Sequence, residues 1–181
     1  MVETVPAALA AWSNFYVIAG SSAAALTGLM FVVITLVRGE EYATRSRHDG
    51  IDTFSTPTVM HFCAALLVSA VLCAPWPSLV YVSVIVVLVG CYGVVYIVRV
   101  AFRARGLKEY TADIEDWIWY SILPFVAYGT LAVGASALQR ASKGALFAVA
   151  GGVLLLIFIG IRNAWDVVTF LAAGGGKKSE P

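Results

Sequence analysis

The stretch from Trp12 to Arg38 carries no charged side chain before its final arginine. The hydrocarbon core of a bilayer is about 30 Å thick, and about 20 helical residues cross it. Because lipid offers no hydrogen bonds to an exposed backbone, a segment of this kind must satisfy its own N–H and C=O groups as a helix. The stretch therefore predicts a membrane-spanning helix.

Composition extends this interpretation to the whole chain. Of 181 residues, 60% are hydrophobic and only 13% are charged, whereas a soluble domain is about 45–50% apolar and about 25% charged. The hydrophobic residues come in long blocks separated by short polar segments. We therefore predict an all-α, polytopic integral membrane protein.

The apolar blocks predict five transmembrane helices, at about 14–37, 56–74, 79–100, 117–138 and 145–165. We treat residues 1–173 as one transmembrane domain and expect the glycine- and lysine-rich segment 174–181 to be a disordered tail. Thr56 and Pro57 match an N-cap hydroxyl followed by a first-turn proline, which predicts the start of the second span. Pro124 should bend the fourth span.

The distribution of basic residues predicts the orientation. Of twelve lysines and arginines, only Arg140 and Lys143 fall on the side of the N-terminus, which leaves ten on the other side. The positive-inside rule then places the N-terminus outside and the C-terminus inside, in a bacterial inner (plasma) membrane. Tryptophans are expected to mark the outer interface at Trp12 and Trp76 and the inner interface at Trp117, Trp119 and Trp165.

The first span carries a stripe of small and weakly polar residues. Spacings of three, four and seven return to the same side of a helix, and such a stripe faces protein or water rather than lipid. Gly20, Ala24 and Gly28 form two successive small-xxx-small steps, which predict a helix–helix contact within one chain or between copies. The residues expected on a pathway or in helix packing are Asn14, Gly20, Ser21, Ala24, Thr27, Gly28 and Thr35.

A second group of polar residues is expected near the inner interface. Ionisable groups at membrane depth often mark a pathway, so these residues could form a gate or an ion-selective collar. The alternative is that they are snorkelling anchors and charges that complement helix dipoles. This inner polar collar consists of His61, Arg99, Glu115, Asp116, Arg162 and Asp166.

Three members of the collar allow more specific predictions. Arg162 and Asp166 are four residues apart and can pair along one helix, and we expect this pair to be buried between helices rather than exposed. His61 is interpreted either as a pH-responsive group or as a hydrogen-bonded residue near the end of the second span.

No cofactor, metal or catalytic constellation is predicted. Cys63, Cys73 and Cys91 lie in apolar spans without metal-ligand spacing, and we expect them to be small buried residues. The sequence 48–52 holds a histidine and two aspartates that could ligate a divalent ion, but the same composition is common in a hydrophilic loop. No phosphate-binding loop or nucleophile elbow is present in the sequence.

These observations favour a homo-oligomeric ion channel or small-solute transport protein, with the stripe of the first span along the path. Five helices with short connections leave little room for a path inside one protomer. The alternative is a non-transporting regulator, sensor or assembly subunit whose small-residue faces bind other membrane helices. An enzyme ranks third. The expected partners are the lipid bilayer, further copies of the chain and other membrane proteins, and no nucleic acid.

Overall fold

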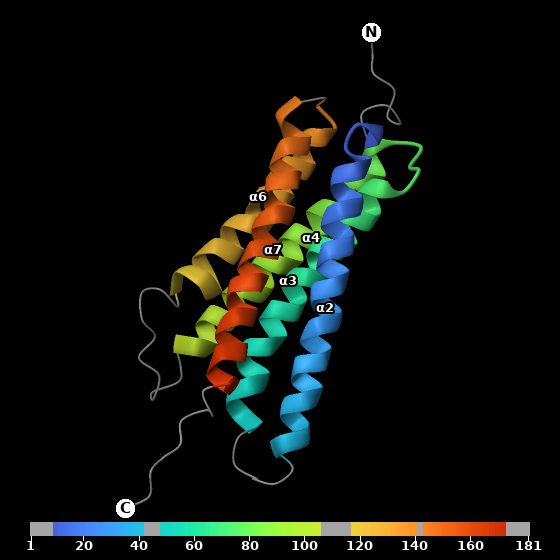
Figure 1. Cartoon of the computed structure of the whole chain (residues 1–181). Helices are drawn as coiled ribbons and strands as arrows, with labels where there is room; N and C mark the ends of the chain where they lie inside the picture. The colour runs from blue at the N-terminus through green and yellow to red at the C-terminus, as the bar shows by residue number, and fades with distance from the viewer. Residues whose placement is uncertain (1–8, 42–47, 106–116, 141–142, 173–181) are drawn as a thin grey trace, which may run out of the picture.

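The computed structural model describes residues 9–41, 48–105, 117–140 and 143–172 (Figure 1). The described residues are helical, with short turns and no strand, which confirms the all-α prediction. The elements are α2 (Ser13–Glu41), α3 (His48–Cys73), α4 (Leu79–Arg105), η1 (Ile118–Ile122), α6 (Leu123–Leu138) and α7 (Lys143–Ala172).

Within this part of the chain, four helical segments are long and apolar enough to cross a membrane. Four of the five apolar blocks therefore form helices with the length and apolarity that a membrane span requires, and the crossing itself stays a prediction. The remaining block, Pro57–Cys73 in α3, is also an apolar helix but a shorter one. The four long segments are Ser13–Thr35, Leu79–Phe102, Ile118–Arg140 and Gly144–Thr169.

The helices pack side by side, with α7 between α3 and α6 (Figure 1). From this centre, α2 packs mainly on α3, and α4 packs mainly on α6. The C-terminal ends of α2, α4 and α7 and the N-terminal end of α3 lie at one end of the bundle (Figure 1). We call this the Ala172 end, and the opposite end, which holds the α6–α7 hairpin, the Ser13 end.

Glycines allow the closest helix contacts. A Cβ atom placed on Gly90 of α4 would lie 2.8 Å from the Tyr128 carbonyl oxygen and 2.8 Å from the Ala132 nitrogen of α6. The two backbones therefore approach each other directly at this point. On the other side of the bundle, Gly160 of α7 provides the surface on which the ring of Phe62 in α3 rests. Small residues thus serve as contact points between helices, as expected in a membrane bundle.

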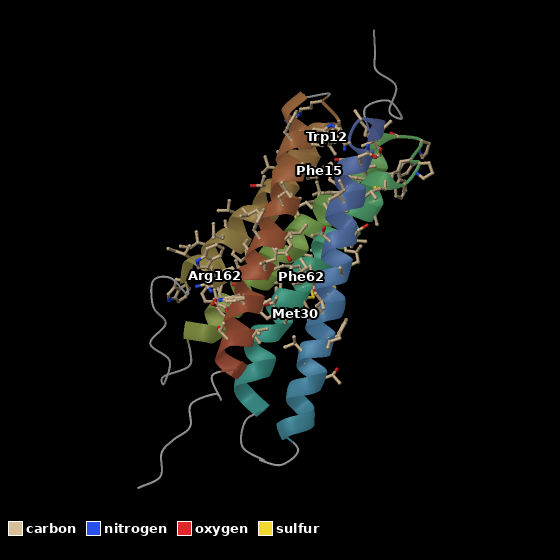
Figure 2. All side chains as sticks on the ribbon, viewed as in Figure 1. Trp12, Phe15, Met30, Phe62 and Arg162 are labelled. Atoms are coloured by element: carbon tan, nitrogen blue, oxygen red, sulfur yellow. The ribbon has the colours of Figure 1, made fainter. Side chains whose placement is uncertain are left out.

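Aromatic side chains tie α2 to α7 at the Ser13 end. The rings of Trp12 and Phe147 meet edge to face with centroids 4.6 Å apart. The hydroxyl of Tyr16, which is 1% exposed, donates to the Leu146 carbonyl oxygen at 3.5 Å. Figure 2 shows Trp12 and Phe15 together at this end.

Helix α3 begins earlier than the sequence pattern predicted. It starts at His48 rather than at residue 56, so Thr56 is not its N-cap and Pro57 lies inside it. Pro57 removes one backbone donor, and its buried ring packs within the bundle. The segment 48–52 is therefore the first part of a helix and not a loop.

The fourth span contains a π-helical turn where a bend was expected. In η1 the Leu123 N–H donates to the Ile118 carbonyl oxygen, five residues earlier. Pro124 follows directly and lies in the first turn of α6. Because proline lacks an N–H and its ring clashes with the carbonyl four residues before it, a wider turn ahead of Pro124 relieves the clash.

The prediction that the cysteines are buried is wrong. Cys63, Cys73 and Cys91 are all exposed on the surface of the bundle and carry free thiols. In a membrane helix, apolarity does not separate a residue that faces lipid from one that faces protein, because both surroundings are apolar.

Candidate functional site

One face of α2 packs into the bundle. It carries Tyr16, Ala19, Ala23 and Met30, all nearly inaccessible. Gly20 lies beside this face, where an added Cβ would come within 3.0 Å of the Ser69 Cβ atom of α3. The structure therefore brings Gly20, one residue of the predicted stripe, into a contact within the protomer.

Most of the stripe lies on the other side of α2. Nothing in the protomer lies within 4 Å of a Cβ atom built on Gly28. Thr27 is partly buried, and its hydroxyl donates to the Ala23 carbonyl oxygen at 2.8 Å. The hydroxyl of Thr35 donates to the Phe31 carbonyl oxygen at 2.7 Å. The exposed members of the stripe are Asn14, Ser21, Ala24, Gly28 and Thr35.

His61 lies in the interior of the bundle. Its side chain is 0% exposed, and because α3 begins at His48, it stands well inside the helix rather than near its end. The Nδ1 atom of His61 is 3.1 Å from the hydroxyl of Tyr128 in α6. Tyr128 in turn packs against Gly93 of α4, where any Cβ atom would collide with its ring. A chain of contacts thus joins α3, α6 and α4.

Asn163 of α7 is a buried polar residue that the sequence analysis did not select. It is 0% exposed, and it lies one helical turn beyond Gly160, the residue against which Phe62 packs. An asparagine inside an apolar block was the signal that could have identified it. Because Phe62, the neighbour of His61, packs on Gly160, one turn from Asn163, we refer to His61, Tyr128 and Asn163 together as the His61 cluster.

The His61 cluster is incompletely hydrogen-bonded. Among the described residues, no partner lies within reach of His61 Nε2 or of either polar atom of the Asn163 amide, Nδ2 and Oδ1. Almost all buried polar atoms in proteins have a partner, and leaving one without a partner costs about 1–3 kcal/mol. Within the described core, the Ser69 hydroxyl is a further buried polar atom without a partner.

A second polar cluster lies nearer the Ser13 end and joins α4 to α6. The buried hydroxyl of Ser83 donates to the Ala135 carbonyl oxygen at 2.7 Å. The side-chain amide of Gln139 donates to the Ser83 oxygen at 3.2 Å. We refer to Ser83, Ala135 and Gln139 as the Ser83 cluster. A lone serine in an apolar block gives no signal in the sequence, so this cluster was not predicted.

Arg162 and Asp166 form the predicted ion pair along α7. Their side chains are 34% and 36% exposed, so the pair is partly buried rather than enclosed between helices as expected. The guanidinium carbon of Arg162 lies 5.8 Å from the ring centroid of Trp119 in η1, which places the cation over the ring. Figure 2 shows Arg162 and Phe62 at a similar level along the bundle.

The remaining members of the predicted collar do not join these residues. Arg99 is exposed on α4, and Glu115 and Asp116 lie outside the described residues. The described part of the collar therefore divides into a buried histidine, a partly buried ion pair and an exposed arginine. No group of three or more His, Cys, Asp or Glu side chains within this part of the chain could hold a metal ion.

The surface between α6 and α7 carries a groove at the Ser13 end. Its walls consist mainly of small and apolar residues, and Thr130 provides a hydroxyl. The lining residues are Phe125, Val126, Gly129, Thr130, Val133, Gly134, Ala137, Gly144, Ala145 and Ala148.

Comparisons with protein-family models, with curated proteins and with solved structures find no match to this chain. The geometry described above is therefore the basis of the proposed function.

Proposed function

We propose that the chain crosses the bacterial inner (plasma) membrane five times, with the N-terminus outside and the C-terminus in the cytoplasm. Four long apolar helices support this topology. The apolar part of α3, residues 57–73, is about 25 Å long at 1.5 Å per residue and would provide the fifth crossing. In the sequence, ten of the twelve basic residues fall within or directly after the segments whose helix ends form the Ala172 end, which favours a cytoplasmic position for that end.

The proposed function is that of a homo-oligomeric ion channel or small-solute transport protein whose copies meet at α2. The small and polar residues on the exposed face of α2, which stand beside Val17, are the observation that supports this function. Asn14, Ser21, Ala24 and Gly28 point away from the protomer's own helices, and lipid is a poor environment for such a face. Against another copy, the small side chains would allow close packing and the polar ones would line a contact or a path.

The filled interior of the protomer supports a path between copies. Tyr16, Phe62, Leu131 and Leu156 are 0–1% exposed, so large side chains occupy the space between the described helices. A path for ions or solutes through one protomer would have to displace these side chains. A path along the shared α2 faces would not.

Ion flux and oligomeric state, measured on the same variants, test this function. Purified protein in liposomes should conduct ions and should cross-link as an oligomer. Ala24→Leu, which adds bulk to the exposed α2 face, should reduce both signals. Val95→Leu is the matched control, because Val95 is an exposed residue of α4 that is 48% accessible. A monomeric protein without flux would contradict the proposal.

A second candidate is a non-transporting subunit that binds other membrane helices, as a regulator, sensor or assembly factor. The hydroxyls of Thr27 and Thr35 favour it, since they donate to carbonyls of their own helix and have no proton left to donate to a passing solute. A protein that copurifies with a different membrane protein and shows no flux would support this candidate over the first.

A further inference from the structure

The His61 cluster has hydrogen-bonding capacity that the protein itself does not use. His61 and Asn163 are both 0% exposed, and among the described residues three of their polar atoms have no partner. Buried polar groups left in this state are commonly satisfied by a bound water molecule, which needs two to four polar partners. The cluster can supply that number.

The packing of α3 against α7 places His61 and Asn163 at nearly the same depth. The two helices run in opposite directions (Figure 1), and Phe62 rests on Gly160. This contact is made by the ring atoms of Phe62, so it places His61 and Asn163 within about one helical turn, about 5 Å, of each other along the bundle.

The chemistry of the cluster defines its ligand. The hydroxyl of Tyr128 engages Nδ1 and thereby orients the ring of His61, leaving Nε2 on the opposite side for the ligand. The amide of Asn163 offers both a donor and an acceptor. The buried polar residues of the described part include no lysine, arginine, aspartate or glutamate, so the ligand is uncharged. The large side chains Phe62 and Ile159 are fully buried nearby, so it is also small.

A third residue with an unpartnered buried atom does not belong to this site. The hydroxyl of Ser69 also has no partner among the described residues. A serine in a helix can turn its hydroxyl toward the carbonyl four residues earlier, so it needs no ligand. Histidine and asparagine side chains are longer, and their polar atoms stand away from their own helix.

We propose that His61 Nε2 and the Asn163 amide form a buried binding site for a water-sized, uncharged molecule that both donates and accepts hydrogen bonds, in the simplest case water. The site lies inside the protomer and is independent of the proposed contact between copies. It gives the bundle a hydrated position at a depth where the neighbouring side chains are apolar.

Solid-state NMR of the full chain in lipid bilayers tests the site, with water as the probe. The sequence has only two histidines, so His48→Gln leaves His61 as the single source of imidazole nitrogen signals. In this variant we expect the Nε2 side of His61 to show a cross-peak to water. A ring without contact to water, or a direct hydrogen bond from His61 Nε2 to Asn163, would overturn the proposal.

A second pair of variants, made in the His48→Gln protein, tests the role of Asn163. Asn163→Leu should weaken the water cross-peak of His61 several-fold, whereas Asn14→Leu should leave it unchanged because Asn14 is exposed at the Ser13 end. An unchanged cross-peak in Asn163→Leu would contradict the assignment of the amide. The His48→Gln measurement decides the proposal even if Asn163→Leu fails to fold, and its readout requires neither flux nor an oligomer.

Discussion

The two buried polar clusters of the bundle differ in how completely they are hydrogen-bonded. In the Ser83 cluster, one hydroxyl both donates to a carbonyl and accepts from an amide, and it thereby fastens α4 to α6. In the His61 cluster, the hydrogen bond between His61 and Tyr128 leaves three polar atoms without a partner in the described part of the chain. The Ser83 cluster is explained by structure alone. The His61 cluster has capacity left for something that binds.

Both clusters depend on the close approach of α4 and α6. Ser83 lies about two helical turns from Gly90, and Gly93 lies one turn beyond Gly90 on the same helix. A side chain at Gly93 would displace Tyr128, the residue whose hydroxyl lies 3.1 Å from His61 Nδ1. The difference between the two clusters can therefore be tested first by a substitution at the α4–α6 contact that they share, and then by substitutions in each cluster.

The largest loss of stability is expected for Gly90→Leu. Its Cβ atom would lie 2.8 Å from backbone atoms of α6, which cannot move as a flexible side chain could. Overpacking of this kind costs about 3 kcal/mol and should disturb both clusters at once. The measurement is thermal unfolding in detergent. Gly151→Leu is the control, because nothing lies within 4 Å of a Cβ atom at that position. Equal melting temperatures for the two variants would contradict the contact.

Smaller losses of stability, different for the two clusters, are expected when one hydrogen-bonding group is removed from each. Tyr128→Phe leaves the buried ring of His61 without its hydroxyl partner and should cost about 1–2 kcal/mol. Ser83→Ala should cost less, about 0.6 kcal/mol, which is typical of a hydrogen bond between membrane helices. The reason is that Gln139 is exposed and can bind water once Ser83 is removed. Unfolding measurements that reverse this order would show that the Ser83 cluster is the more important one for stability.

The sequence predicted the elements of this fold more accurately than their boundaries. Long apolar blocks are sufficient to predict helices, because a backbone in lipid must form all of its N–H to C=O hydrogen bonds within the segment. The predicted boundaries were wrong where a helix continues into charged residues beyond the apolar block. Helix α3 begins at His48, before its apolar block, and α4 continues to Arg105, beyond its own.

The candidate site was predicted only in part, because a helix face has no partner until the topology is known. Periodicity selected a small-residue stripe on α2, but only the packing against α3 shows that Gly20 faces inward and Gly28 outward. His61 was identified because it is an ionisable residue in an apolar span, but its burial depends on helices that are distant in the sequence. Asn163 and Ser83 are single polar residues whose roles arise only from tertiary contacts.

The smallest effect is expected at the Arg162–Asp166 pair, which lies at the edge of the bundle and provides a contrast to both clusters. A pair enclosed between helices would lose about 3–5 kcal/mol when one partner is removed. The side chains are 34% and 36% exposed, so water or lipid headgroups can solvate a partner that is left alone. The Trp119 ring holds the cation in place from the other side and contributes about 0.5–1 kcal/mol at such a site.

A double-mutant cycle measures this pair directly. We expect the coupling between Arg162→Gln and Asp166→Asn to be about 0.5 kcal/mol, the value typical of pairs four residues apart on a helix, when stability is followed by thermal unfolding in detergent. A coupling above about 2 kcal/mol would show that the pair is enclosed in the membrane protein. Arg162→Lys keeps the charge but loses the planar group that lies over Trp119. If this variant is less stable than the cycle predicts for the ion pair alone, the difference belongs to the contact with the ring.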